Sequence, residues 1–589
     1  MGLRSIFMNF NFKGLYNTAF WASVLGMFAF IFDFGFSHVI VVQQIIDAFY
    51  FIVIALGLLA TFARYFGNTQ LFSRKVAIFD IISVAYTLYV FYMYLFVGEA
   101  FKTDLILDNP LWIVLAVILS FIREVSERKF NLNRTFFNPA QIFILSFLVI
   151  ILLGSFLLML PKATYSGISF VDALFTSTSA VCVTGLIVVD TATYFTTFGQ
   201  AIILCLIQIG GLGILTFASY FSYFFKGGST YENQLTLSEI TNSQKVSDVF
   251  STLKYIIIIT ATVEFIAAIL IFFSLDASLI KDLADRVFFS IFHAISAFCN
   301  AGFSTLSNNM YQTGFRFNYN LQLILIACFV LGGLGFPIVV NLIKYLKHKI
   351  INLLSLNSSF KIYKPWILHI NSRISLITTL SLTVVGFILF FILEYNNTLA
   401  PHSIYGKVVN ALFGATTPRT AGFNSVAMNE LAFPTIMVTF LLMWVGASPA
   451  STGGGIKTST FAIAVLNILS LAKGKRRIEV FRREIADISV NRAFATIALS
   501  LIVIGLGVTL ITIFDPKKGL LNIAFECFSA YSTVGLSLGI TAGLSTSSKL
   551  VVAAIMFIGR VSMLSIMVAI FKKIKHTNYR YPSEEITIN

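Results

Sequence analysis

Four short apolar segments, each running into a glycine, recur along the chain at nearly equal spacing. The glycines lie 117, 120 and 113 residues apart, a regularity that predicts four copies of one structural unit. A stretch of about 12 apolar residues cannot cross a bilayer, so each segment fits a short helix that enters the membrane and turns back. The segments are LFTSTSAVCVTGL (174–186), IFHAISAFCNAGF (291–303), LFGATTPRTAGF (412–423) and AFECFSAYSTVGL (524–536), aligned on Gly185, Gly302, Gly422 and Gly535.

The four segments share further positions when they are aligned on the glycine. A hydroxyl side chain stands six residues before each glycine, and a large apolar residue follows it. A phenylalanine stands ten residues before three of the glycines, whereas the third copy has Leu412 there and Phe413 one residue later. The hydroxyl residues are Ser179, Ser296, Thr416 and Ser529, the following residues are Leu186, Phe303, Phe423 and Leu536, and the phenylalanines are Phe175, Phe292 and Phe525.

The rest of the chain is apolar enough to require a membrane. Its 589 residues are 57% hydrophobic and 11% charged, with a mean hydropathy of +0.87. A soluble core could not hide this much apolar surface, so lipid must surround most of the protein. Apolar runs of about 20 residues predict twelve membrane spans, near 18–37, 44–64, 76–98, 110–123, 138–160, 200–224, 254–275, 321–345, 374–394, 435–470, 494–514 and 549–571.

The repeat divides the chain into five parts. We expect four units at 136–230, 231–350, 351–475 and 476–589, each consisting of a span, a short helix, a glycine segment and a second span. Residues 1–135 carry four spans of their own and fall outside the repeat. The predicted fold class is therefore an all-α polytopic membrane protein with four span–pore-loop–span repeats around a pseudo-fourfold axis plus about four extra N-terminal transmembrane helices.

The glycine segments carry the chemistry expected of an ion pathway. Irregular backbone is tolerated at membrane depth only where it is buried in protein or lines water. Rings of backbone carbonyls can replace the water shell of a cation, and glycine permits the positive φ that turns carbonyls toward an axis. Around Gly185 there are no carboxylates, which magnesium or calcium would require, so potassium fits better. The predicted ion-binding residues are Val183, Thr184, Gly185, Asn300, Ala301, Gly302, Thr420, Ala421, Gly422, Thr533, Val534 and Gly535.

A second set of motifs follows the glycines by about 24 to 30 residues. They are IGGLG (209–213), LGGLG (331–335), VGASP (445–449) and IGRVS (558–562), and they place small residues where helices can approach closely. Arg560 in the fourth copy aligns with Gly211, Gly333 and Ala447. An arginine in an apolar span should face the protein interior, so we expect it near the axis, with pairing to a buried acid, Glu264 or Glu526, as the alternative.

The third copy interrupts its own helix with GASPASTGGGIKTST (446–460). A proline followed by three glycines cannot continue a regular helix. Because the stretch is too polar for lipid, it should line the cavity. Gly453, Gly454, Gly455 and Lys457, together with Arg560, are the predicted gate, and a static kink between two helix halves is the alternative.

Other functions are less consistent with these residues. The formal charge is +15. The basic residues are concentrated in segments that would all lie on one side of the membrane if the spans alternate in direction, which predicts cytoplasmic loops and cytoplasmic termini rather than nucleic-acid binding. A twelve-span secondary transporter of another solute would show twofold repeats. An enzyme would need converging nucleophiles, acids or metal ligands, whereas the six histidines are scattered. We therefore expect a transport protein that is not an enzyme and binds no cofactor.

The motifs TSTSAVCVTGLIVVDT (176–191), SAFCNAGFSTLSNN (296–309), TTPRTAGFNS (416–425) and GASPASTGGGIKT (446–458) closely resemble those of the bacterial Trk/Ktr potassium transporter family, relatives of the plant HKT proteins. The segment NPAQIFILSFLVIILLGSFLLMLPKAT (138–164) does so as well. The resemblance covers about residues 135–575 and does not extend to the four N-terminal spans.

The resemblance implies a potassium uptake subunit in the bacterial plasma membrane. It implies that Gly185, Gly302, Gly422 and Gly535 form the selectivity filter and that Arg560 is a charged constriction beside an intramembrane gate at 446–458. It also implies a homodimer on a cytoplasmic ring of nucleotide-binding regulatory subunits, which would be a separate protein. Glycine at all four positions resembles the potassium-selective members, and coupling to sodium stays open.

Overall fold

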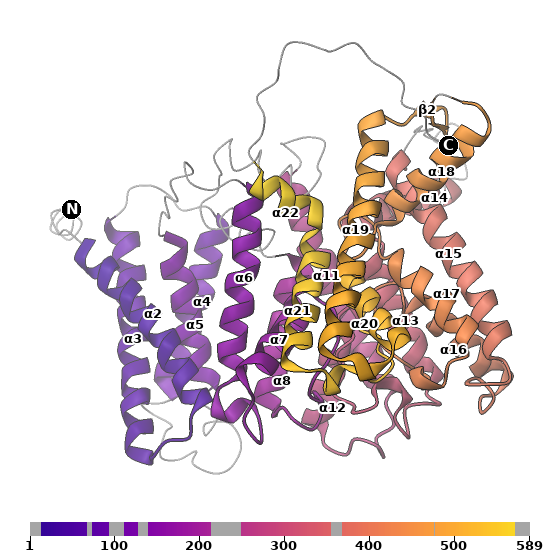
Figure 1. Ribbon diagram of the computed structural model, residues 1–589. Helices are drawn as coiled ribbons and strands as arrows, with labels where there is room; N and C mark the ends of the chain where they lie inside the picture. The colour runs from indigo at the N-terminus through magenta and orange to yellow at the C-terminus, as the bar shows by residue number, and fades with distance from the viewer. Residues whose placement is uncertain are drawn as a thin grey trace.

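The computed structural model of the chain describes residues 13–67, 74–93, 111–127, 139–213, 249–354, 368–475 and 477–571. These ranges are almost entirely helical (Figure 1). The two short strands, β1 (Glu479–Val480) and β2 (Arg483–Glu484), form an antiparallel hairpin. The predominantly helical prediction is therefore confirmed.

The N-terminal part is a separate bundle of helices beside α6, at the left of Figure 1. Its charged side chains are buried in pairs between helices. Asp80 forms an ion pair with Arg123 at 2.6 Å and accepts from the Tyr65 hydroxyl at 2.8 Å, and Asp33 accepts from the Tyr50 hydroxyl at 3.1 Å. Both aspartates therefore make polar contacts between helices. The helices are α2 (Lys13–Gly35), α3 (Ile40–Gly67), α4 (Arg74–Tyr92) and α5 (Leu111–Glu127).

The bundle meets the remainder of the protein through the end of α2. The Phe34 ring lies 6.0 Å from the Phe198 ring, and Lys162 donates to the Asp33 carbonyl at 3.3 Å. A Cβ on Gly35 would lie 2.8 Å from a methyl carbon of Leu160, so glycine allows the end of α2 to contact the segment after α6. The bundle is therefore seated on the loop after α6 and the start of α8 (Thr197–Leu212).

The remaining helices follow one order four times: a long helix, a short helix, a glycine segment and a further helix or helix pair. Three main apolar cores mix residues from different units, which ties the units into one body. The elements are α6 (Pro139–Leu158), η2 (Pro161–Ala163), α7 (Phe170–Val181) and α8; α11 (Val249–Ser274), α12 (Leu283–Phe298), η4 (Asn309–Tyr311), α13 (Tyr319–Gly333) and α14 (Phe336–Leu354); α15 (Ile370–Glu394), α16 (Ile404–Thr416), η6 (Met428–Glu430), α17 (Phe433–Trp444) and α18 (Thr458–Ala472); α19 (Asp487–Phe514), η7 (Pro516–Lys518), α20 (Leu520–Ser532), η8 (Thr541–Gly543), α21 (Thr546–Val561) and α22 (Met563–Ile570).

The membrane spans are less uniform than the sequence predicts. Within the described ranges, six helices are long and apolar enough to cross a membrane, and up to eight spans result if each of two bent pairs counts as one. Each of the twelve predicted runs contains a helix, and residues 94–98 and 214–224 of two of them lie outside the described residues. Within the described residues, three of the runs are not continuous. The run at 321–345 bends by 106° between α13 and α14, the run at 549–571 bends by 85° between α21 and α22, and the run at 435–470 is interrupted between α17 and α18.

The breaks have identifiable backbone causes. Gly335 has a φ of +85° and Ser562 a φ of +74°, values that an α-helix cannot continue through. Between α17 and α18 the polar chain from 445 to 457 replaces helix altogether. Apolar runs therefore predicted where the membrane-embedded chain lies but not where it turns inside the membrane.

Candidate functional site

The four short helices α7, α12, α16 and α20 each end a few residues before an aligned glycine. Their last turns are fully buried, and in Figure 1 they lie in the lower half of the molecule. Serine caps start two of them, since Ser169 accepts from the Asp172 N–H and Ser403 from the Gly406 N–H. The C-terminal end of a helix carries partial negative charge, so all four bring such charge to the glycine segments.

The backbone after each helix has a positive φ at the same two positions in all four copies. The aligned glycine has a positive φ of 91° at Gly185, 70° at Gly302, 78° at Gly422 and 94° at Gly535. The residue two positions earlier also has a positive φ although it has a side chain. Such residues are uncommon and cost about 1–3 kcal/mol, which the surrounding structure must offset. They are Val183 (56°), Asn300 (60°), Thr420 (74°) and Thr533 (50°).

The four glycine segments meet one another in a closed cycle. A Cβ on Gly302 would lie 2.9 Å from the Cα of Gly422, and one on Gly535 would lie 3.0 Å from the Cα of Gly185. A carbonyl oxygen of the next segment lies at each glycine: that of Ala301 at Gly185, of Ala421 at Gly302, of Val534 at Gly422 and of Thr184 at Gly535. The twelve residues predicted as ion-binding thus lie in one place, although they come from four distant parts of the chain.

Buried hydroxyl groups hold these segments in shape. Ser179 and Ser529 each accept the N–H of their own glycine, Gly185 and Gly535, at 3.1 Å. In the second copy the Ser296 hydroxyl instead donates to the Phe303 carbonyl at 2.7 Å. Each hydroxyl therefore fixes the backbone immediately around the aligned glycine.

The third copy corrects our alignment by one residue. The Thr417 hydroxyl, not that of Thr416, donates to the Phe423 carbonyl at 2.5 Å, while Thr416 bonds back into its own helix at the Leu412 carbonyl. The reason is a turn that is one residue shorter. The Ala421 N–H donates to the Thr417 carbonyl, four residues back, whereas the Thr184 N–H donates to Ser179, five back. The fully buried Phe413 occupies the matching place for the same reason.

One side of the glycine ring opens into a cavity of about 570 Å³. The four glycines form part of its lining, and Asp190 is the acidic side chain among the lining residues. Asn309, which has a φ of 53°, donates from its side-chain amide to the Gly302 carbonyl at 3.3 Å. A hydrated cation could therefore approach the ring through this cavity and meet backbone oxygen and mostly uncharged side chains.

On the other side, the second set of motifs brings the following helices against the ends of the short helices. A Cβ on Gly210 would meet the Val181 carbonyl oxygen, one on Gly332 that of Phe298, and one on Gly559 that of Tyr531. The residue that follows the first glycine of a motif also lies in close contact with a short helix. A Cβ on Gly211 would lie 2.9 Å from the Cβ of Cys299. The prediction that small residues allow close approach at this level is confirmed.

These contacts predict that alanine is not tolerated at the first glycine of each motif. Gly210→Ala, Gly332→Ala and Gly559→Ala are each expected to destabilise the purified protein by about 1–3 kcal/mol, because an added methyl overpacks a buried contact. Gly505→Ala is the matched control, since a Cβ there meets no atom within 4 Å. The midpoint of thermal unfolding should fall for the three variants and stay unchanged for the control. Equal midpoints for all four would contradict the packing argument.

The chain between α17 and α18 crosses directly beneath two glycine segments. A Cβ on Gly453 would meet the Thr420 hydroxyl oxygen, and one on Gly454 would meet the Thr533 hydroxyl. Gly455 has a φ of +68° and would place a Cβ 3.3 Å from that of Ser532. No side chain would fit at these three positions, which gives a packing reason for the glycines. The role of the loop as a gate stays a prediction.

Two long cations hold this loop by its carbonyl groups. Lys457 donates to the Gly453 carbonyl at 2.6 Å, and half-buried Arg560 donates to the carbonyls of Thr452 and Gly210. Arg560 therefore lies beside the loop, as predicted. The alternative pairing with an acid is wrong, because Glu264 accepts from Gln208 and Glu526 accepts from Ser537 and Thr541.

The loop is also fixed to the second unit. The Ser448 N–H donates to the Gly333 carbonyl at 2.9 Å, and the Thr452 hydroxyl donates to the Phe298 carbonyl at 3.3 Å. Within the described part of the chain, no group of three or more His, Cys, Asp or Glu side chains could hold a metal ion.

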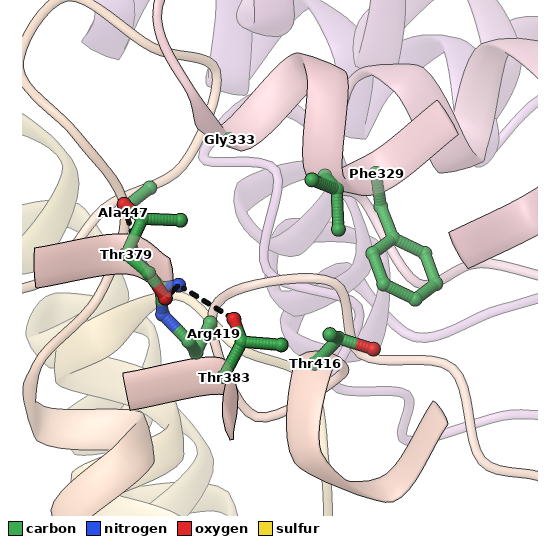
Figure 2. Close-up of a pocket in the computed structure, with 8 residues that line it drawn as sticks. Phe329, Gly333, Thr379, Thr383, Thr416, Arg419 and Ala447 are labelled. Carbon is green, nitrogen blue, oxygen red and sulfur yellow. Dashed lines mark hydrogen bonds between the residues drawn. The ribbon is translucent and has the colours of Figure 1, made fainter. Parts of the chain in front are cut away.

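Sequence reasoning missed Arg419, which lines a small pocket behind the third glycine segment (Figure 2). Its side chain donates to α15 and to the first turn of the loop. A signal was present in the alignment, because the residue three positions before the glycine is Cys182, Cys299 or Ser532 in the other copies. A long cation among three small residues marks a place where the third unit differs.

Comparison with known proteins agrees with this geometry. The family model described as cation transport protein, TrkH, matches residues 111–580. The chain is 36% identical over 452 residues to Ktr system potassium uptake protein B of Bacillus subtilis, covering 76% of this chain and 96% of the relative. It is 36% identical over 461 residues to the potassium/sodium uptake protein NtpJ of Enterococcus hirae, covering 77% and 97%.

A solved structure has a similar fold. The potassium transporter TrkH from Vibrio parahaemolyticus superposes with a TM-score of 0.58 and 16% sequence identity, covering 84% of this chain and 97% of that one. The several apolar spans, together with the family match, are consistent with a multi-pass membrane transport protein. The chain belongs to the TrkH family of cation transport proteins.

Proposed function

We propose that this chain is the membrane-embedded subunit of a potassium uptake system and that potassium crosses at the ring of glycine segments. The observation that carries the proposal is the cyclic arrangement in which each aligned glycine lies against a carbonyl oxygen of the next segment. Backbone carbonyls that surround one point can replace the water shell of a potassium ion. The names of the relatives, both potassium uptake proteins, support potassium as the cargo.

In this proposal the twelve residues 183–185, 300–302, 420–422 and 533–535 form the selectivity filter. The left-handed residues at the start of each triplet and the glycine at its end rotate the peptide groups between them. The loop with Gly453, Gly454 and Gly455 obstructs the path beneath the filter, and Lys457 and Arg560 add positive charge there. A cation leaving the filter meets this obstruction before it reaches the cytoplasm.

The proposal extends to the assembly. We infer a homodimer in the bacterial plasma membrane, with both termini cytoplasmic and a separate ring of nucleotide-binding subunits that regulates the loop. The chain itself binds no cofactor, and potassium is its cargo. Sodium is a second candidate ion, favoured by the printed name of the Enterococcus hirae relative.

Growth rescue tests the proposed function most directly. A strain that lacks potassium uptake should grow at low external potassium when it expresses this chain with its cytoplasmic partner. The experiment is run with and without added sodium, and an empty vector is the control. Growth that depends on sodium would indicate a coupled ion, and no rescue by a membrane-inserted protein would reject potassium uptake.

The driving force gives a quantitative prediction. One charge gains about 2.3 kcal/mol per 100 mV of membrane potential. At about 1.4 kcal/mol per tenfold ratio, each 100 mV supports a roughly fiftyfold accumulation of rubidium in vesicles. The amount of rubidium taken up should therefore rise and fall with a membrane potential that is imposed by means other than a potassium gradient. Uptake that is unchanged when the potential is collapsed would exclude passive entry through a carbonyl filter.

A further inference from the structure

Arg419 occupies a position that distinguishes the third unit from the others. It stands three residues before Gly422, where the other copies have Cys182, Cys299 and Ser532. The third unit is also the one in which the loop at 445–457 separates the two inner helices, whereas α13 and α14, and α21 and α22, meet at a short bend. The two departures from the repeat therefore occur in the same unit, and the contacts of Arg419 connect them.

The guanidinium group of Arg419 is shared between a helix and the loop. It donates to the Thr379 carbonyl of α15 at 3.2 Å and lies 3.4 Å from the hydroxyls of Thr379 and Thr383. Its other nitrogen donates to the Gly446 carbonyl at 3.4 Å, at the start of the loop. Figure 2 shows the side chain between Thr379 and Thr383, with Ala447 nearby. The side chain thus bridges the third glycine segment, α15 and the loop.

The guanidinium of Arg419 is held by uncharged groups. All four acceptors are carbonyl or hydroxyl oxygens. A partly buried charge without an opposite charge needs such oxygens, and the bond to the Gly446 carbonyl is the one that it makes to the loop. Arginine presents donors in a fixed planar fork, and lysine cannot reach several acceptors in the same way. The adjoining cavity of about 20 Å³ has room for about one water molecule.

The same stretch of chain touches the loop a second time. The next residue, Thr420, places its hydroxyl where a Cβ of Gly453 would be. Thr420 also hydrogen-bonds to the Asn300 side chain at 3.1 Å, which links the third glycine segment to the second. A displacement of the loop would therefore break the Arg419 bond to Gly446 and release the Thr420 contact together.

We propose that Arg419 is a positioning residue that couples the loop at 445–457 to the third glycine segment, so that movement of the loop changes the shape of the ring as well as opening the path. The inference rests on the proposed function for its consequence, ion selectivity. Its structural part, the coupling of the two segments, can be measured without transport.

Hydrogen exchange on the purified full chain tests the coupling. In Arg419→Gln and Arg419→Lys, exchange should become about tenfold faster both at the loop amides of Ala447 and Ile456 and at the Ala421 amide in the segment. The loop amides donate to the carbonyls of Gly454 and Trp444, and Ala421 donates to Thr417. If Arg419→Gln is not recovered as folded protein, Arg419→Lys carries the same test. Unchanged exchange at the loop or at Ala421 would overturn the proposal.

A double variant, Thr379→Val with Thr383→Val, is the matched control. It removes two hydroxyl acceptors on α15 and leaves the bond to Gly446, so loop exchange should stay at the wild-type level. The same loop exchange as in Arg419→Gln would overturn the proposal, because Arg419 would then only anchor α15.

Ion selectivity is the second readout. The ratio of rubidium to sodium uptake should fall about tenfold in Arg419→Gln, and an unchanged ratio beside faster loop exchange would overturn the coupling to the filter. A wild type that carries neither ion would reject the proposed function. The response of the Ala421 amide would still decide whether the two segments are coupled.

Discussion

Rubidium uptake is expected to fall at least a hundredfold when Gly302 or Gly422 is replaced by Asp. A Cβ on Gly302 would lie 2.9 Å from the Cα of Gly422, and a Cβ on Gly422 would meet the Val534 carbonyl oxygen. Both glycines have a positive φ that side chains rarely adopt. An aspartate would thus push adjoining segments apart and place a charge where only carbonyls face the ion. Initial rubidium uptake, normalised to the membrane-inserted protein, is the measurement.

Gly167→Asp is the matched control for these variants. Gly167 has a φ of +77°, so aspartate meets the same backbone strain, but a Cβ there meets nothing within 4 Å. Its uptake should stay near the wild-type level. If Gly302→Asp and Gly422→Asp both keep the flux and selectivity of the wild type, these glycines do not form the ion site.

Removing the obstruction beneath the ring should have the second large effect, in the opposite direction. Deletion of Gly453–Gly455 is expected to raise initial rubidium uptake about tenfold, because these residues fill the space against Thr420 and Thr533. Arg560→Gln should raise uptake in the same direction by lowering the electrostatic barrier. Lowering a barrier by about 1.4 kcal/mol gives a tenfold higher rate.

The two changes should not add in the double variant. Arg560 donates to the carbonyl of Thr452, the residue directly before the deletion, so both changes act on one contact. Neighbouring residues of this kind commonly show coupling energies of about 0.5–3 kcal/mol. The four proteins of the cycle are compared at equal amounts in the membrane. Multiplicative effects of the two changes would mean that Arg560 and the loop form separate barriers.

Arg482→Gln is the control for loss of a positive charge, because Arg482 is exposed in the β1–β2 turn. Its uptake should match the wild type. If the deletion variant is well folded and its flux is unchanged or lower, the loop is a structural kink, and the gate lies elsewhere.

Much of the architecture follows from local properties of the sequence. Apolar runs located the membrane-embedded helices, because a bilayer demands continuous hydrophobic chain. The spacing of Gly185, Gly302, Gly422 and Gly535 located the four segments that meet in the structure, because a repeat preserves the backbone geometry that each unit needs. The same reasoning failed at Thr416, where the true counterpart is Thr417. A turn that is one residue shorter changes the register without leaving any trace in hydrophobicity.

The sequence by itself therefore determined that the chain lies in a lipid bilayer, how many glycine segments it has and which residues those segments carry. Only the tertiary structure decided which groups meet: the Thr184 carbonyl at Gly535, Arg560 on Thr452 and Gly210, and Arg419 between α15 and the loop. The physical reason is distance along the chain. Residue patterns report helix periodicity over a few turns, whereas the acceptor that a long cation finds depends on packing between segments that lie 27 to 350 residues apart in the chain.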